Sequence, residues 1–167
     1  MKFMKQGCIL TFIAIATISM DSLAQIPKAQ ETKGATSAEP DPKQYSGMYS
    51  FLKEGEFVQL TVEDDGRVTG LISRYGDSES DKETFLDQFF KTAKLDGKKL
   101  SFTTKIVHGV SFDFSGSIER GEGKNPGDEA YFVLKGTLTE NATDANKKAT
   151  SKSQDVVLRM FPASPGS

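Results

Sequence analysis

The sequence predicts an all-β protein, an eight-stranded antiparallel up-and-down (meander) barrel. From Tyr45 to Phe161 the chain consists of short segments in which apolar and polar residues alternate, as they do in half-buried strands. Gly and Asp separate these segments, and most of the connections are too short for a helical crossover. Because short links join neighbouring antiparallel strands, we expect a meander, and closure into a barrel would remove its two free edges.

Residues 1–24 have the features of a secretory signal peptide. Two lysines precede an apolar run from Cys8 to Met20, and small residues, Ser22 and Ala24, stand before Gln25 as in a cleavage site. The run is shorter than the roughly 20 apolar residues that a membrane-spanning helix needs. We therefore expect cleavage before Gln25, export to the periplasm or the medium, and no membrane span in the mature chain.

Residues 25–43 are rich in Pro, Ala, Ser and Thr and contain no aromatic side chain. Such a segment buries too little apolar area to offset the entropy lost on ordering, so we interpret it as a disordered linker. The barrel domain is expected over residues 44–163, with a short polar tail at 164–167.

The eight strands are expected at residues 47–52, 56–63, 67–75, 88–95, 99–106, 110–119, 130–139 and 155–161. Residues 85–90 could form a single helical turn, because Phe85 and Phe89 are four positions apart. Residues 140–154 are expected to be a polar loop before the last strand.

The direction of the side chains follows from the alternation. In strand 110–119, Val110, Phe112 and Phe114 alternate with polar residues such as Ser111 and Asp113, which is the clearest strand pattern in the chain. In strand 88–95 the inward face is ambiguous, because Lys91 interrupts the series Phe89, Ala93, Leu95.

The hairpin formed by the second and third strands has a register that the sequence can decide. A three-residue loop at 64–66, with Gly66 in the left-handed conformation, places Val58 opposite Ile72 and Leu60 opposite Gly70. A two-residue loop would mix the apolar and polar faces, so the three-residue loop is predicted.

Three short motifs resemble segments of the avidin family. Gly-Met-Tyr at 47–49, Gly-Arg-Val-Thr-Gly at 66–70 and Phe-Ser-Gly at 114–116 are similar to that family's Gly-x-Trp, Gly-x-x-Thr-Gly and Trp-Ser-Gly segments. The resemblance, which extends to calycin-type barrels such as lipocalins, implies an eight-stranded barrel that binds a small molecule at one mouth, commonly as an oligomer. The biotin pocket of the family is walled by Trp, whereas this chain has Tyr49, Phe114 and Phe132 in those places, so tight biotin binding is not expected.

A candidate binding site lies at the barrel end that carries the long polar loops. There Glu56 is expected to face Arg74, which could hold an anionic head group above an apolar body enclosed by aromatic side chains. The candidate ligand-binding residues are Tyr49, Phe51, Glu56, Ile72, Arg74, Phe112 and Phe114. The alternatives are that Glu56 and Arg74 form only a cross-strand pair and that the Phe residues simply fill the core.

Composition excludes several other classes of function. A formal net charge of -2 provides no basic footprint for nucleic acid. One Cys and one His permit neither a disulfide framework nor a Cys/His metal cluster, so we expect no metal, no cofactor and no enzymatic activity. A hydrolase would need an acid or a Ser close to the single histidine, His108, which lies in a turn.

Apolar residues occupy both faces of the last two strands. Tyr131, Val133, Val157 and Phe161 fall on the outer face, where a homo-oligomer interface, the linker or the 140–154 loop could cover them. The sequence thus predicts an exported, non-enzymatic barrel that binds a small, partly apolar molecule at its long-loop mouth. The alternative is a filled barrel that acts through its surface as an interaction, inhibitor or assembly module.

Overall fold

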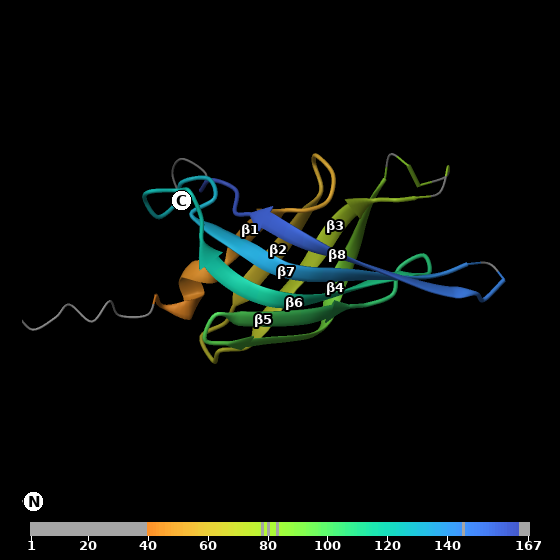
Figure 1. Cartoon of the computed structure of the whole chain (residues 1–167), viewed down its shortest axis with the longest axis horizontal. Coiled ribbons are helices and arrows are strands. Elements are labelled where there is room, and N and C mark those ends of the chain that lie inside the picture. Colours follow the sequence, from red (N-terminus) through yellow and green to blue (C-terminus); the bar gives the residue numbers. More distant parts are fainter. Residues whose placement is uncertain (1–39, 78, 80, 83, 145, 164–167) are drawn as a thin grey trace, which may run out of the picture. The chain divides into compact units, whose positions relative to one another are not determined.

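The computed structural model describes residues 40–163 except 78, 80, 83 and 145. The predicted signal peptide, most of the predicted linker and the 164–167 tail lie outside the described residues. Eight antiparallel strands follow one another in sequence order in a single sheet, which curls into a half-barrel (Figure 1). The elements are η1 (Pro42–Tyr45), β1 (Gly47–Ser50), β2 (Phe57–Val62), β3 (Val68–Tyr75), β4 (Phe85–Asp96), β5 (Lys99–Thr104), β6 (Val110–Arg120), β7 (Phe132–Thr143) and β8 (Ala149–Arg159). The all-β, up-and-down fold class is therefore confirmed.

The register predicted for the hairpin of β2 and β3 is also confirmed. Val58 pairs with Ile72 and Leu60 with Gly70. At the turn, the Gly66 amide donates a 2.9 Å hydrogen bond to the Glu63 carbonyl oxygen, and Gly66 has a φ of 78°. The left-handed conformation that this loop requires is thus supplied by glycine, which bears no Cβ.

The fourth strand differs from its prediction. Residues 85–90 extend the strand and form no helical turn, because β4 continues to pair with β3 as far as Phe85 opposite Tyr75. A β-bulge at Lys91 shifts the register between Phe90 and Thr92. Because one extra residue reverses the alternation, Gln88 and Phe90 share the interior side with Ala93, while Phe89 is exposed.

The expected polar loop at 140–154 is mostly strand. β7 runs to Thr143 and β8 begins at Ala149, and Figure 1 shows this hairpin projecting beyond the other strands. Polar side chains pair across it, since Thr139 Oγ1 lies 2.8 Å from Ser153 Oγ and Thr137 Oγ1 donates to Asp155 at 3.0 Å. The prediction failed because a strand that is polar on both faces shows no apolar alternation.

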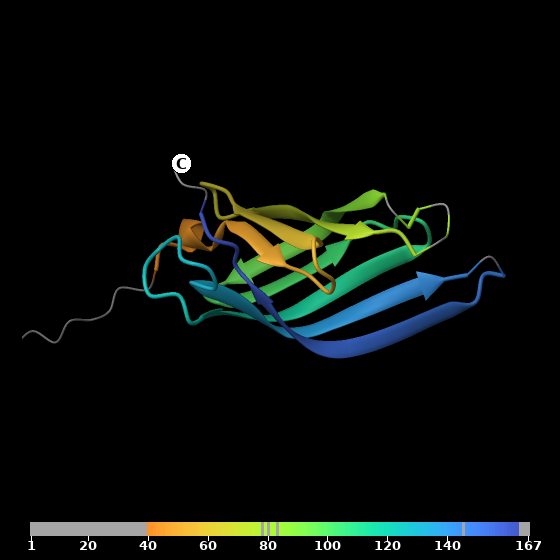
Figure 2. The same ribbon diagram turned by 90° about the horizontal axis from the view of Figure 1, so that it is seen from above.

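The curl brings the first strand to the last (Figure 2). β1 and β8 approach through an isolated bridge between Tyr49 and Met160, and the Phe161 amide donates to the Met48 carbonyl oxygen at 2.8 Å. Before Met160, the described residues of β8 pair only with residues of β7. The two edges of the sheet therefore meet near the end of β8, and the projecting hairpin keeps a free edge.

Side chains fill the space that the sheet encloses. The rings of Phe90 and Phe102 stack with centroids 4.3 Å apart, and Phe102 stacks on Phe114 at 5.2 Å. At the η1 end, Tyr45 meets Phe132 edge to face at 5.0 Å. Such pairs add to the stabilisation from burial alone, so the aromatic residues act here as core.

Two glycines allow the neighbouring strands β6 and β7 to curl. Gly116 pairs with Gly136, and a Cβ placed on Gly136 would lie 2.5 Å from the Gly116 Cα and 2.4 Å from the Ser115 carbonyl oxygen. Only a residue without a side chain fits at so close an approach of two backbones.

Candidate functional site

The seven residues predicted to bind a ligand come from strands β1, β3 and β6 and from the loop between β1 and β2, and all are buried. Their side chains are at most 8% exposed: Tyr49, Phe51, Glu56, Ile72, Arg74, Phe112 and Phe114. The structure brings three of them together, since Phe51 contacts Phe112 edge to face at 5.3 Å and the Arg74 guanidinium lies 5.6 Å from the centre of the Phe112 ring. Each of these contacts joins two side chains of the predicted site to each other.

Arg74 is held by a set of internal acceptors. Its Nε donates to Gln88 Oε1 at 2.7 Å, and its Nη1 donates to the Tyr75 carbonyl oxygen at 2.9 Å and to Asp77 Oδ2 at 2.7 Å. Asp77 thereby balances the charge of a guanidinium that is almost fully buried. An anionic head group would have to displace Asp77 to reach Arg74 through this nitrogen.

Glu56 has a local role in the structure. Its Oε1 accepts a hydrogen bond from the Tyr75 amide and its Oε2 one from the Lys53 amide, both at 3.1 Å. The register places Phe57 opposite Ser73, so Glu56 and Arg74 do face each other as predicted, but each binds other groups. Glu56 thus fixes the loop between β1 and β2 against the end of β3.

Gln88 is the residue that sequence analysis missed. It is completely buried, and its Nε2 donates to the Val110 carbonyl oxygen at 2.8 Å and to the Lys105 carbonyl oxygen at 3.3 Å. Its Oε1 accepts from Arg74. Gln88 therefore links β3, β4 and the start of β6, and it closes the long-loop end of the interior with satisfied polar groups. Only the parity reversal at Lys91 could have revealed it.

His108 lies where it was predicted, in the turn before β6. His108 and Gly109 have φ values of 50° and 78°, and the Val107 and Val110 backbones bond on either side of them, as in a type I′ turn. His108 Nδ1 lies 2.7 Å from Asp81 Oδ2, so a carboxylate does orient this imidazole. An acid therefore does lie beside the single histidine, one of the two kinds of partner that a hydrolase would need.

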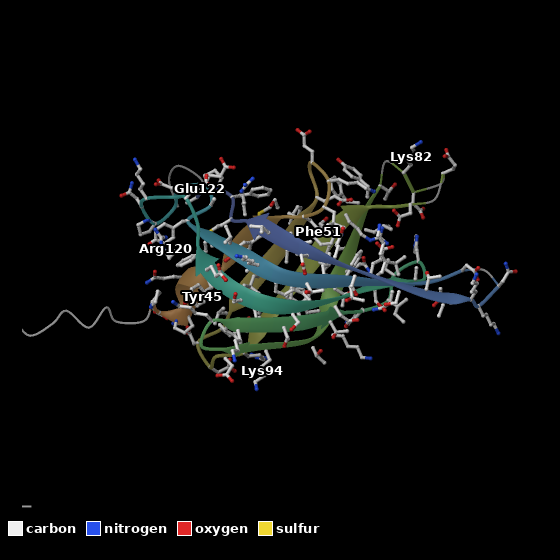
Figure 3. All side chains as sticks on the ribbon, viewed as in Figure 1. Tyr45, Phe51, Lys82, Lys94, Arg120 and Glu122 are labelled. Atoms are coloured by element: carbon white, nitrogen blue, oxygen red, sulfur yellow. The ribbon has the colours of Figure 1, made fainter. Side chains whose placement is uncertain are left out.

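The apolar outer patch is partly covered by the chain itself. The Arg120 guanidinium stacks 3.4 Å from the centre of the Tyr131 ring, and Val133 is buried. Figure 3 shows Arg120 beside Glu122 at this end of the sheet. Val157 and Phe161 remain 54% and 37% exposed. The cover thus comes in part from β6, which the sequence analysis did not consider.

Hollows of ligand size occur away from the predicted pocket. One, of about 560 Å³, lies beside η1 and is lined by apolar side chains that include Met48, Met160 and Phe161. Another, of about 620 Å³, lies over β3 and β4. Neither is lined by any of the seven predicted residues.

Two further features of the described residues bear on function. No group of three or more His, Cys, Asp or Glu side chains in the described part of the chain could hold a metal ion. Within the same residues, no helix has the length and apolar character required to cross a membrane.

Comparisons with protein-family models, curated proteins and solved structures gave no match to this chain. The eight-stranded, antiparallel, curled sheet is compatible with the barrel that the avidin-like motifs imply. It carries no assignment to that family, because a fold does not determine a function.

Proposed function

We propose that the mature chain is an exported, non-enzymatic binding module that acts through the outer surface of a filled barrel. The supporting observation is the packing of the predicted pocket: its seven side chains are at most 8% exposed, and the five apolar ones belong to the hydrophobic core. A small-molecule site needs a cavity of about 300 Å³ or more. None of the seven residues lines the hollows of that size described above, which favours a surface partner.

Native mass spectrometry of the protein purified from the cells that make it tests this proposal. We expect the mass of the bare mature chain, or of its complexes with macromolecules, with no stoichiometric small molecule. A small molecule bound to every copy, and lost in an Ile72→Phe variant whose added ring would occupy the interior, would contradict the proposal. The matched variant Ser115→Phe, at an exposed position of β6, should change nothing.

A second candidate function is the binding of a small apolar molecule in the hollow beside η1. This hollow is favoured by its volume of about 560 Å³ and by a lining that includes Met48, Tyr131, Met160 and Phe161. Thermal unfolding measured with and without apolar ligands would test this candidate. A ligand should raise the melting temperature of the wild type but not that of Met48→Asp, which places a charge in the hollow.

A homo-oligomer is a narrower form of the surface proposal. Val157 and Phe161 are the exposed members of the predicted apolar patch. Light scattering after size-exclusion chromatography, with Val157→Lys as the variant, would show whether copies of the chain associate there.

A further inference from the structure

A groove opens in the wall of the half-barrel between β3 and β4. The two strands pair from Tyr75 opposite Phe85 as far as Leu71 opposite Phe89. Beyond that point, Val68–Gly70 pair with β2 and Thr92–Asp96 pair with β5, and the registers of the described residues contain no further β3–β4 pair. Two strand edges therefore face the groove, and strand edges are templates for an added extended chain.

The floor of the groove is closed by an aromatic ring. Phe90 stacks on Phe102 inside the core, and a Cβ on Gly70 would lie 2.6 Å from Phe90 Cε2. The ring thus packs directly against the Gly70 backbone and seals the interior. The hollow above it measures about 620 Å³ and lies on the outer side of the wall.

The charges that line the groove are of one sign. Arg67, Lys91 and Lys105 contribute to the lining, and it contains no Asp or Glu. Among the described ion pairs, Arg67 has an exposed partner, Asp65, at 3.5 Å, whereas Lys91 and Lys105 appear in none. Since the whole chain has a net charge of -2, this is a local cationic groove on an acidic protein.

An apolar contact surface lies beside these charges. Phe89 is 53% exposed and lines the groove together with Leu71. An exposed aromatic residue next to unpaired strand edges is the arrangement by which sheets recognise extended peptides, with main-chain hydrogen bonds giving affinity and alternate side chains giving specificity.

We propose that this groove binds an extended, acidic segment of a partner protein, which adds as a strand between β3 and β4 and places carboxylates against Lys91, Lys105 and Arg67. The inference rests on the surface function proposed above and names its partner class. Because side chains alternate between the two faces of a strand, the carboxylates on one face of the added strand could contact the cations while its backbone forms hydrogen bonds with the strand edges.

Fluorescence anisotropy with labelled alternating peptides tests the proposal. The probes are an octapeptide of alternating Glu and Val, its Lys-Val counterpart, and a Glu-Val peptide N-methylated at every second residue, which removes backbone donors but keeps the charge. We expect the Glu-Val peptide to bind, the Lys-Val peptide not to bind, and N-methylation to weaken binding by about tenfold or more.

The double variant Lys91→Glu/Lys105→Glu supplies the second arm. It should weaken binding of the Glu-Val peptide by about tenfold or more, whereas Lys152→Glu, at another exposed position, on β8, should leave it unchanged. Because all three lysines are exposed, the variants should fold, and their thermal unfolding is the control.

Three results would overturn the inference: equal binding of both unmodified peptides, no effect of the double variant, or binding of an anionic amphiphile such as dodecanoate without binding of any peptide. Any of these results would refute the peptide-binding groove but would not bear on whether the interior of the barrel is filled. Failure of the proposed surface function instead appears as a small molecule in the native mass, so the two outcomes are distinguishable.

Discussion

The Tyr49 hydroxyl donates a 2.6 Å hydrogen bond to the carbonyl oxygen of Tyr45 inside the core. This bond links η1 to β1, the shortest of the described strands. Tyr49 also forms the isolated β-bridge to Met160, the residue that follows β8. Tyr49 therefore joins η1 through its side chain and the end of the sheet at Met160 through its backbone.

Removing that hydroxyl should destabilise the fold. Tyr49→Phe removes a buried hydrogen-bond donor from the Tyr45 carbonyl oxygen, at an expected cost of about 1–3 kcal/mol. Urea unfolding followed by circular dichroism measures the loss. Tyr131→Phe, whose ring is only partly buried, is the matched control and should change the free energy of unfolding by less than about 0.5 kcal/mol.

Stability should also fall steeply at alkaline pH. Burial, with a smaller contribution from Tyr45, raises the pKa of Tyr49 well above its usual value of 10.0. A group whose pKa is raised on folding contributes stability below its unfolded pKa and loses it as the pH rises above that value. We expect the free energy of unfolding to decline above about pH 10 in the wild type and less steeply in Tyr49→Phe. Equal slopes would show that Tyr49 is not the group responsible.

The loop between β6 and β7 should loosen in acid. The amides of Asn125 and Lys124 donate to Asp128 at 2.8 and 2.9 Å, and these bonds, that of Asn125 first, lower the pKa of Asp128 from 3.8. The stabilisation is present above pH 3.8 and is lost as the pH falls through the lowered pKa.

NMR of the Lys124 and Asn125 amides checks the effect of this carboxylate. Asp128→Ala should shift both signals and speed their hydrogen exchange at neutral pH, whereas Glu129→Ala, its exposed neighbour, should not. Unchanged amide signals in Asp128→Ala would refute the role given to this carboxylate.

The paired glycines should tolerate no side chain. In Gly136→Ala the new methyl group would meet the backbones of Ser115 and Gly116 at 2.4–2.5 Å, so β6 and β7 must separate. We expect a loss of about 1–3 kcal/mol, as for overpacked cores. Lys135→Ala, the exposed preceding position, is the control in the same denaturant titration. A Gly136→Ala protein as stable as that control would mean that the curl does not depend on this close approach.

The sequence was sufficient where one face of a strand is apolar. The alternation in β6 and the glycine turn between β2 and β3 determine register locally, and both were predicted correctly. The interior of β4 was not predictable in the same way, because the bulge at Lys91 arises from pairing with β5, which alternation within one strand does not encode.

The buried polar residues of the candidate site show the same limit of prediction from sequence. The hairpin register predicted that Glu56 and Arg74 lie opposite each other, but it did not predict the groups to which each of them binds. Gln88 reaches Arg74 from β4, and Asp77 comes from a loop whose path depends on tertiary structure. Residue type and parity indicate which side chains turn inward, whereas partner choice is decided by packing.

Whether the interior is filled is best measured by adding volume to it. Ile72 is completely buried, so Ile72→Phe should overpack the core and lower the free energy of unfolding by about 1–3 kcal/mol, while the exposed Ser115→Phe should have little effect. An Ile72→Phe protein as stable as the wild type would show that the sheet encloses open space, and would contradict a barrel that acts only through its surface.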